Sequence, residues 1–411
     1  LLIGSVAIGD WTLARQTTGQ ENVAVGSSAW NITTGGSNAI LGQYSASSLT
    51  TGYNNTVLGS YSGAAITTGS SNVSINQSMN QKVYQWDGTS VNTYGAYSYP
   101  VLTDATPNTG SSNIAIGNSA LNHNTTGSSN IAIGNQAMAG GLGSGYSITA
   151  ATPFYDAVAN TGWRNIAIGE LVLYKNASGD DNIAFGFNSL YKNSSGFRNF
   201  AAGVNALYKN TTGTDNIGIG LDAIYSNQTS WGNIGIGLNA LKYVTGGKNT
   251  AIGHSAGENA TTGENNIFIG YNSQPASATD SNKITLGDSN ITHLRCQVTS
   301  ITALSDARDK KNVQGSIYGL DFINKLRPVT FEWDMRDGGK AGQKDLGFLA
   351  QDLIEVEDEL DAHEILNLTM RSNPDKLEAS YGRLVPILVK AVQDLSQEVN
   401  DLKQLLKEKD L

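Results

Sequence analysis

The stretch Asn165-Ile166-Ala167-Ile168-Gly169 decides the fold of this chain, because variants of it return along most of the sequence. The leading asparagine comes back at Asn182, Asn199 and Asn216, and most steps between copies are 17 residues, with a few of 16. Within each copy the apolar residues alternate over a few positions and then meet a glycine. This pattern is typical of a short, half-buried strand that ends in a turn.

A unit of 17 residues is too short to bury its own apolar side chains. Stacking the copies as coils of a β-solenoid pairs each strand with its equivalent in the next coil and produces one continuous core. We expect this core to contain residues such as Ile166, Ile168 and Leu173. At a strand spacing of about 4.8 Å, roughly fifteen coils would form a rod on the order of 70 Å long. The sequence therefore predicts a mainly β chain with a 16/17-residue-repeat β-solenoid over residues 1–304.

The position between the two predicted core residues is small in nearly every copy, as at Ala167, Ala184 and Gly218. It points to the other side of the strand, and its small size indicates that another surface approaches closely there. We interpret that surface as a neighbouring chain about a threefold axis, which predicts a homotrimer; the alternative is the coil's own loops. The copies are similar to the head repeats of trimeric bacterial adhesins, which form a β-roll, although those repeats are usually shorter.

Stacked coils also predict rows of side chains along the rod. One row alternates in charge, so that a slip by one coil would place like charges together; its members are Arg164, Asp181, Arg198 and Asp215. A second row consists of tyrosines, namely Tyr174, Tyr191, Tyr208 and Tyr225. We interpret these rings as a structural stack that shields the coil edges, and a surface on which glycans stack is the alternative.

Two insertions interrupt the period, at about residues 78–111 and 139–163. Loops that project from a rigid scaffold commonly carry recognition, and aromatic side chains suit sugar or protein surfaces. The candidate receptor-contact residues are therefore the aromatic ones in these insertions: Tyr84, Trp86, Tyr94, Tyr97, Tyr99, Phe154 and Tyr155. The alternative is that these loops pack on the rod or on a neighbouring chain.

Charged residues become much more frequent near residue 305. Residues 1–304 contain 11 Lys or Arg and 14 Asp or Glu, whereas residues 305–411 contain 15 and 21. This change predicts a domain boundary at that point, with a second domain over residues 305–411. The net charge of −9 disfavours binding to a nucleic acid, whose backbone is itself negative.

The single cysteine, Cys296, excludes an intrachain disulfide framework, which fits folding in a reducing cytosol. There is no run of 18 apolar residues and no basic leader before an apolar segment, so we expect neither membrane insertion nor a signal peptide. Because Leu1 lies inside a repeat, the natural N-terminus is expected upstream. The four histidines are scattered without the spacing of metal ligands, and we expect no metal and no cofactor.

Four motifs follow one another between residues 305 and 411. They are Ser305-Asp306-Ala307-Arg308-Asp309-Lys310, Leu326-Arg327-Pro328-Val329, the stretch from Gly347 to Asp352, and the stretch from Tyr381 to Pro386. Together they resemble the endosialidase-type intramolecular chaperone (the peptidase S74 family), which ends many phage tail fibres and spikes. The resemblance covers essentially all of this segment. It implies a small α+β domain that holds three chains in register while the fibre upstream folds.

The resemblance further implies that this domain severs itself just before the serine, at a bond that here joins Leu304 and Ser305, with Ser305 as nucleophile and Lys310 as base. A lysine can take the hydroxyl proton only if desolvation or neighbouring cations lower its pKa. Arg308 and Lys311 would act in that direction, while Asp306 and Asp309 would oppose it. Five positions on an α-helix lie about 140° apart, so the two side chains must meet through a turn or across chains. The alternative is a chaperone that never cuts and stays attached as a cap.

The last segment, at about residues 384–409, is expected to be a helix of a trimeric coiled coil. Its apolar residues recur in steps of 4, 3, 4, 3 and 4, which is the coiled-coil spacing and a signal of self-association. The predicted trimerisation residues are Leu388, Val392, Leu395, Val399, Leu402 and Leu406.

We therefore interpret the chain as the distal part of a homotrimeric viral tail fibre, assembled in the host cytoplasm and carried on the virion. Its expected partners are a host-surface glycan or protein and the upstream fibre, tail or baseplate proteins. The predicted chemistry is a single-turnover Ser/Lys autoproteolysis. Two rival interpretations are a bacterial trimeric surface adhesin and a polysaccharide depolymerase tailspike, in which Asp181 and Asp215 would be paired carboxylates roughly 5 to 10 Å apart.

Overall fold

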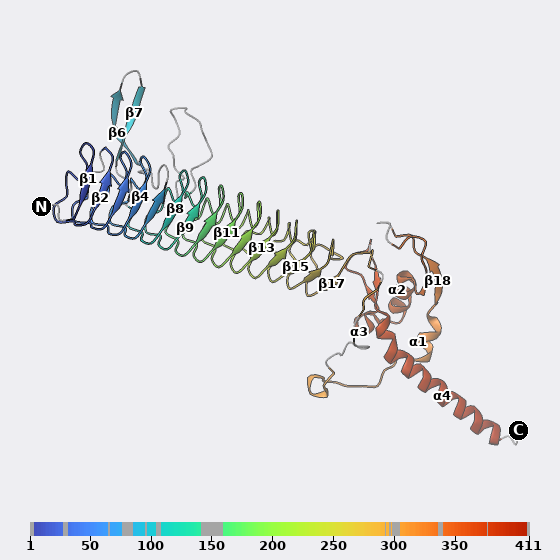
Figure 1. The fold of residues 1–411 in the computed structure, drawn as a ribbon. Coiled ribbons are helices and arrows are strands. Elements are labelled where there is room, and N and C mark those ends of the chain that lie inside the picture. The colour runs from blue at the N-terminus through green and yellow to red at the C-terminus, as the bar shows by residue number, and fades with distance from the viewer. Residues whose placement is uncertain are drawn as a thin grey trace. The chain divides into compact units, whose positions relative to one another are not determined.

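The computed structural model shows two compact units, Leu1–Leu286 and Gly287–Leu411 (Figure 1). The predicted domain boundary at residue 305 falls inside the second unit. Only the backbone is described for residues 85–94 and 97–103. The other residues that the structure describes are 4–27, 32–64, 66–75, 108–140, 159–291, 293–295, 297, 305–335, 340–375 and 377–408.

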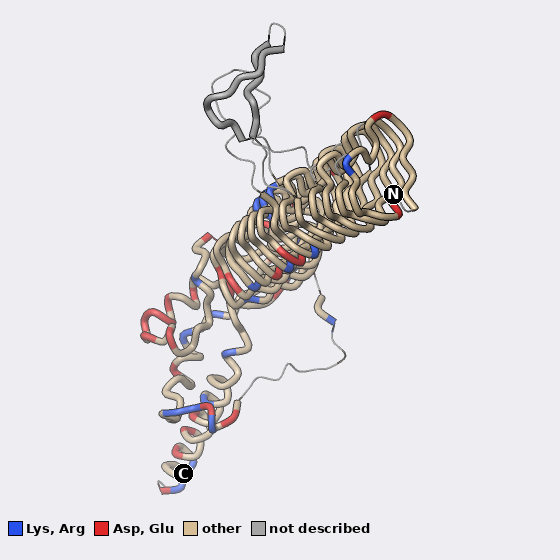
Figure 2. The backbone as a smooth tube through the Cα atoms, turned by 90° about the vertical axis from the view of Figure 1, so that its left-hand side faces the viewer, with Lys and Arg blue, Asp and Glu red and all other residues tan. Residues whose placement is uncertain are grey.

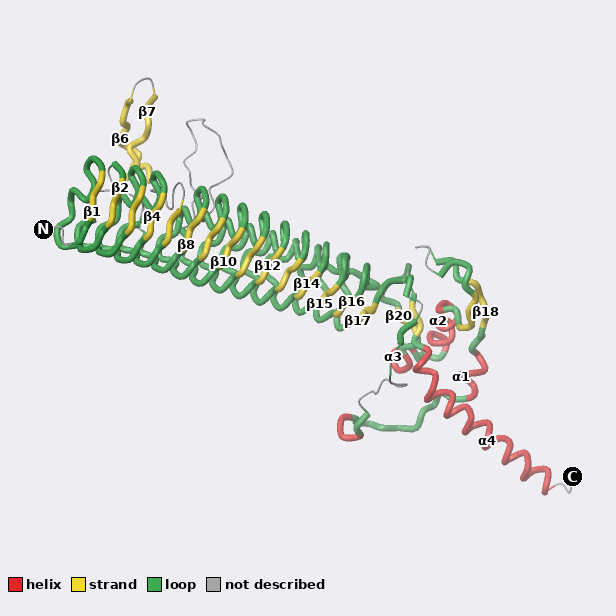
Figure 3. The backbone as a smooth tube through the Cα atoms, viewed as in Figure 1, coloured by secondary structure: helices red, strands yellow, loops and turns green. Residues whose placement is uncertain are grey.

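The first unit contains a parallel sheet of 15 strands in which each strand pairs with that of the next coil. The strands are β1 (Val6–Ile8), β2 (Val23–Val25), β3 (Ala39–Leu41), β4 (Thr56–Leu58), β5 (Val73–Ile75), β8 (Ile114–Ile116), β9 (Ile131–Ile133), β10 (Ile166–Ile168), β11 (Ile183–Phe185), β12 (Phe200–Ala202), β13 (Ile217–Ile219), β14 (Ile234–Ile236), β15 (Thr250–Ile252), β16 (Ile267–Ile269) and β17 (Ile284–Leu286). Figure 3 shows them in one row, with loops closing each coil. The predicted β-solenoid is confirmed.

The side chains that fill the coils differ in part from the prediction. Ala167, at the centre of β10, has no exposed surface, whereas Ile166 is half-buried and Ile168 is 36% exposed. The prediction that Ile166 and Ile168 lie in the core was therefore wrong, while Leu173 is fully buried as expected. In this sheet, the central residue of each strand from β2 to β16 is buried against its own coil, and it is small in most of them. This was the alternative to contact with a neighbouring chain.

The interior beside the strands is narrow because side chains from the opposite side of the coil occupy it. A Cβ added to Gly218 would lie 3.3 Å from the side chain of Leu207, which is fully buried. Phe268 is the largest of the few large residues at the central strand position, and it is fully buried. It faces Gly257, where an added Cβ would lie 2.6 Å from the phenyl ring. Large and small residues therefore compensate across the coil, as close packing requires.

Two rows of buried asparagines run through the interior. In the first row, the Oδ1 of Asn182 accepts the backbone N–H and the side-chain Nδ2 of Asn199, both at 3.1 Å. The Nδ2 of Asn199 also donates to the carbonyl of Gly213 at 2.8 Å. In the second row, the Nδ2 of Asn210 donates to the Oδ1 of Asn193 at 2.9 Å. Each asparagine thus satisfies buried backbone groups of its own coil or the next one.

The sheet continues across both insertions. The strand β5 pairs with β8, with Val73 opposite Ile114, and β9 pairs with β10, with Ile131 opposite Ile166. The first insertion contains an antiparallel hairpin of β6 (Gln85–Tyr94) and β7 (Tyr97–Thr103). The coil register therefore resumes unchanged after each inserted segment.

The second unit contains short helices and strands around its own core. Its elements are η1 (Ala307–Asp309), α1 (Leu320–Lys325), β18 (Val329–Glu332), β19 (Lys344–Gly347), α2 (Ala350–Glu359), α3 (His363–Leu366), β20 (Thr369–Met370), β21 (Glu378–Ala379), η2 (Tyr381–Arg383) and α4 (Leu384–Glu408). The strands form two antiparallel pairs, β18 with β19 and β20 with β21. The core consists of Tyr318, Phe322, Val356, Ala362, Leu366, Leu368, Leu384 and Ile387.

A buried carboxylate joins three elements of this unit. The side chain of Glu357, on α2, has no exposed surface, and its Oε1 accepts the backbone N–H of Leu368 at 2.6 Å. Its Oε2 accepts the Thr369 hydroxyl at 2.5 Å and the Arg371 Nη2 at 3.1 Å, and His363 Nδ1 lies 3.2 Å away. Burial alone would raise the pKa of Glu357, but these hydrogen bonds lower it below its usual value.

Replacing Glu357 with alanine is expected to destabilise the second unit by about 1–3 kcal/mol, because the buried N–H of Leu368 and the Thr369 hydroxyl would lose their acceptor. Arg371 would keep its ion pair with Asp358. Since the folded-state pKa of Glu357 is lowered, its contribution is present above the unfolded pKa of about 4.3 and is lost as the pH falls through the folded pKa. Amide hydrogen exchange at Leu368, measured against pH, checks both statements. Exposed Glu355→Ala is the control, and equal exchange in the two variants would contradict the prediction.

Candidate functional site

A short turn, η1, shapes the segment that begins at Ser305. Asp306 has extended backbone before the turn, and its Oδ1 accepts the backbone N–H of Arg308 at 2.8 Å. After the turn, the backbone N–H of Lys310 donates to the carbonyl of Ala307 at 3.2 Å. These contacts reverse the chain, so that the residues on either side of the turn approach each other.

The turn brings the side chain of Lys310 to Ser305. The Nζ atom donates to the Ser305 Oγ at 2.6 Å and to the Ser305 carbonyl oxygen at 3.2 Å. Of the two routes that the sequence allowed, a turn or a contact across chains, the turn within one chain provides this contact. Leu304, the predicted residue before the scissile bond, lies outside the described residues.

Two of the neighbouring charges form an ion pair. Arg308, expected to help lower the lysine pKa, pairs with Asp306 at 2.6 Å. This ion pair lowers the pKa of Asp306 and raises that of Arg308. The positive charge of Arg308 is thus largely balanced by its neighbour. Lys311 is exposed.

The arrangement provides a hydroxyl and an amine in direct contact. A protonated lysine donates to the hydroxyl oxygen, whereas a neutral lysine at the same place can accept the hydroxyl proton and activate the oxygen as a nucleophile. Ser305 and Lys310 are both exposed to solvent in the single chain. The contact is therefore in place between two groups that are open to water.

The other three quoted motifs contact one another. Arg327, of the second motif, forms an ion pair with Asp352, of the third, at 2.7 Å. The Tyr381 hydroxyl, of the fourth motif, accepts the backbone N–H of Phe348 at 3.0 Å and lies 3.2 Å from the Phe348 carbonyl oxygen. A Cβ added to Gly347 would lie 2.7 Å from the same hydroxyl, which explains the need for glycine there. The motifs thus build one folded unit.

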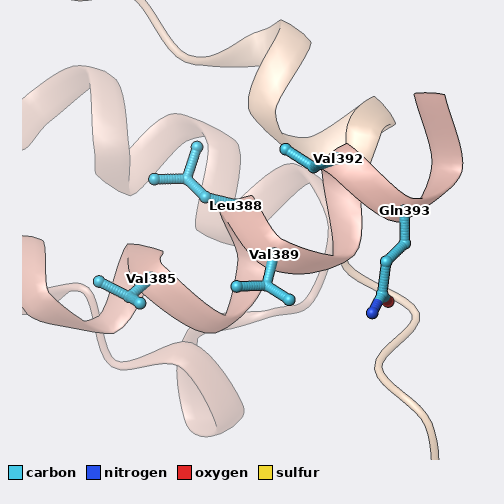
Figure 4. A pocket seen from close by; sticks show the side chains of 5 residues that line it. All are labelled: Val385, Leu388, Val389, Val392 and Gln393. Carbon is cyan, nitrogen blue, oxygen red and sulfur yellow. The ribbon is translucent and has the colours of Figure 1, made fainter. Parts of the chain in front are cut away.

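The helix α4 has two apolar sides. Leu384, Ile387 and Ala391 are buried within the second unit. The predicted trimerisation residues are exposed on α4: Leu388, Val392, Leu395, Val399, Leu402 and Leu406. Figure 4 shows the start of this exposed surface, a shallow recess lined by Val385, Leu388, Val389, Val392 and Gln393. On this 25-residue helix, the exposed apolar residues have the spacing that is typical of a coiled coil.

The predicted receptor-contact residues fall on the two insertions. Trp86 and Tyr94 lie on β6, and Tyr97 and Tyr99 on β7, with Tyr94 opposite Tyr97. The remaining candidates lie outside the described residues: Tyr84, Phe154 and Tyr155. Their proposed role stays a prediction.

The charged row consists of ion pairs. Arg164 donates from Nε to Asp181 at 2.5 Å, and Arg198 donates likewise to Asp215 at 2.6 Å. These contacts lower the pKa of both carboxyl groups. A glycosidase needs one carboxyl group that still holds its proton near neutral pH. The pairing therefore disfavours the depolymerase interpretation for Asp181 and Asp215.

The tyrosine row is a stack, with neighbouring ring centroids 5.1–5.2 Å apart from Tyr174 to Tyr225. The neighbouring rings therefore cover one another. A different set of aromatic residues escaped the sequence analysis: Trp163, Phe197 and Trp231. The available signal was their recurrence every 34 residues, twice the repeat period.

Within the described residues, no group of three or more His, Cys, Asp or Glu side chains is placed to hold a metal ion. None of the helices in that part of the chain is long and apolar enough to cross a membrane.

Comparison with known proteins identifies one segment. Residues 305–362 match the Peptidase_S74 family model, described as the chaperone of endosialidase. The match starts at Ser305 and includes three of the four quoted motifs. It supports an intramolecular chaperone role in a fibre- or endosialidase-like protein. No curated protein and no solved structure matches the chain.

Proposed function

We propose that this chain is the distal part of a homotrimeric viral tail fibre. The β-solenoid is its shaft and adhesive body, and the segment from Ser305 is an intramolecular chaperone that releases itself after assembly. The contact that carries the proposal is the one between Lys310 Nζ and Ser305 Oγ, at 2.6 Å, at the first residue of the family match. A chaperone that stayed attached would need no amine beside that hydroxyl.

Cleavage before Ser305 is a hydrolysis in two steps. First, neutral Lys310 Nζ accepts the hydroxyl proton while Oγ attacks the carbonyl carbon of Leu304. The peptide C–N bond then breaks, and the leaving amine of Ser305 takes up that proton, which leaves an ester between Leu304 and Oγ. Water hydrolyses the ester to a carboxylate on Leu304 and restores the hydroxyl of Ser305. Each chain reacts once, because its own bond is the substrate.

Assembly is the event that would switch this reaction on. The neutral amine is favoured when water is excluded from it, and Lys310 is exposed in the single chain. Packing of other chains against this segment would supply the missing desolvation. Cleavage would then follow trimerisation and not precede it.

The strand side of the solenoid offers a second surface for the trimer. Outward positions beside and after the strands carry apolar side chains in coil after coil, and many are well exposed, including Ile168, Phe187, Val204, Ile217, Leu221, Leu238, Ile252 and Ile269. Large apolar surfaces of this kind mark interfaces. Two further copies of this chain fit as the occupants, because they carry the same rows at the same spacing and a threefold axis closes the assembly.

Replacing Val399 with aspartate in the uncut Ser305→Ala background is expected to prevent trimer assembly. Three carboxylates would then meet at the threefold axis of the coiled coil, without a cation to pair with. Light scattering after size exclusion should give the mass of three 43.3-kDa chains for the background protein and less for the variant. The neighbouring exposed Asn400→Asp is the matched control and should keep the full mass. A Val399→Asp protein that stays trimeric would refute the role of this stripe.

In the assembled particle, the fibre would adhere to a glycan or protein of the host surface and join upstream fibre, tail or baseplate proteins. The family match and the long stacked sheet support this interpretation over a compact enzyme. Synthesis and trimerisation would take place in the host cytoplasm before the fibre becomes part of the virion. The second candidate is a bacterial trimeric surface adhesin. The observation in its favour is the similarity of the repeats to the head repeats of such adhesins.

A further inference from the structure

The coil corner before each strand carries a large aromatic side chain in alternate coils. Trp163 precedes β10, Phe197 precedes β12 and Trp231 precedes β14, and these residues are 49%, 38% and 54% exposed. The backbone holds them in line, since the N–H of Asp181 donates to the Trp163 carbonyl at 3.0 Å and the N–H of Asp215 to that of Phe197 at 3.2 Å. The three residues follow one edge at intervals of roughly 10 Å, twice the strand spacing.

Because the three aromatic residues occupy every second coil, their rings do not stack on one another. In the tyrosine row, residues such as Tyr191 and Tyr208 occupy consecutive coils, and their rings stack on each other. In the corner row, Asp180 and Thr214 occupy the coils between the aromatic residues. Among the described residues, no aromatic ring stacks on Trp163, Phe197 or Trp231. The solenoid thus contains two aromatic rows. The tyrosine rings cover one another's faces, whereas the rings of the corner row are separated.

Neighbouring cations hold two of the separated rings. The guanidinium of Arg198 lies 4.4 Å from the ring centroid of Phe197, and the Nζ of Lys248 lies 4.8 Å from that of Trp231. These contacts orient the rings. The remaining exposed ring surface is open to a ligand.

The polar groups of this edge are balanced in charge. The cations are Arg164, Arg198 and Lys248, and the anions are Asp180, Asp181 and Asp215, so three positive charges stand against three negative ones. Arg164 and Arg198 are each engaged with an aspartate through two hydrogen bonds. The edge therefore offers hydrogen-bond donors and acceptors without the net charge that would attract a polyanion or polycation.

We propose that Trp163, Phe197 and Trp231 form a binding row for a linear, uncharged polysaccharide, with the chain lying along the solenoid edge. Sugar rings have apolar faces that stack on aromatic side chains, and their hydroxyls bind charged polar groups. An interval of roughly 10 Å corresponds to about two sugar residues of an extended glycan, so one ring contacts every second sugar. This inference deepens the proposed function, on which it rests, by naming the receptor class.

The test is native gel electrophoresis of the full-length Ser305→Ala chain in gels that contain a soluble polysaccharide. The probes are linear mixed-linkage β-glucan, linear mannan and, as a polyanion, alginate. A neutral polysaccharide should retard the parent, and the Trp163→Ala/Trp231→Ala double variant should bind it at least about tenfold more weakly. Trp11→Ala is the matched control, because Trp11 is 72% exposed at another slot of the coil, and it should bind as the parent does.

Three outcomes would refute the proposal that this row binds a polysaccharide. They are absence of retardation by both neutral probes, equal retardation of parent and double variant, and preference for alginate that disappears with salt. Loss of the three-chain mass in the double variant would instead show that the row is a contact between chains, which also refutes the proposal. Cleavage before Ser305 is tested separately in chains that retain the serine, so failure of the glycan row and failure of the proposed function are distinguishable.

Discussion

The purified parent chain is expected to separate into two fragments on a denaturing gel, the second beginning at Ser305, whereas Ser305→Ala should remain a single 43.3-kDa chain. Lys310→Ala should show nearly the same loss, because the hydroxyl would have no amine at 2.6 Å to take its proton. Removing a general base typically costs about 10²–10⁴-fold in rate. Intact-mass measurement of the fragments would locate the cut bond.

The matched control is Lys403→Ala, which removes an exposed lysine of α4 outside the predicted trimerisation residues and should leave cleavage intact. Lys310→Arg should be as inactive as Lys310→Ala, because a guanidinium does not lose its proton in proteins. An uncut parent chain would leave the chaperone as a permanent cap. Cleavage that persists in Lys310→Ala would remove the lysine from the mechanism.

Replacing Gly203 with alanine is expected to disrupt the solenoid locally. Gly203 follows β12 with a φ of +134°, and an added Cβ would lie 2.6 Å from the carbonyl oxygen of Gly220 in the next coil. The backbone strain costs about 1–3 kcal/mol, and the overlap costs about as much again. The neighbouring coil cannot relax easily, because a glycine with the same backbone follows there as well. Amide exchange in β12 and β13 should rise strongly.

Gly232 provides the control, because its φ of +70° is also positive but an added Cβ meets nothing nearer than 3.9 Å. Equivalent slots hold Arg164, Asp181 and Asp215 with φ near +57°. Gly232→Asn should therefore leave exchange in the flanking strands nearly unchanged, since asparagine tolerates this conformation. Equal effects of the two substitutions would show that steric contact between coils does not set the cost.

The repeat period was sufficient to predict the coils, because strand and turn residues return at a fixed interval. It could not decide which side of the strand faces inward, because a strand such as Ile166-Ala167-Ile168 has two apolar faces. Alternation shows which residues share a face. The choice is made by Leu173, which enters the interior from the other side of the coil and leaves room only for alanine.

For the candidate site, the sequence predicted which two residues meet but not how they meet. The five-residue spacing of Ser305 and Lys310 excluded one regular helix but left a turn and a contact across chains equally open. The capping hydrogen bond of Asp306 favours the turn, and that contact depends on local backbone geometry. The aromatic row was missed because the period of 17 conceals a period of 34, and only exposure distinguishes Trp163 from a core residue.

The pairing of β5 with β8 has a consequence for how such a chain can change over generations. Val73 and Ile114 meet as if they belonged to consecutive coils, although about forty residues separate them. Insertions at such places are tolerated when the flanking backbone bonds are kept. The segment inserted between β5 and β8 can therefore vary in length and sequence while the register of the coils stays the same. New sequences can be inserted there without any change in the side-chain packing inside the coils.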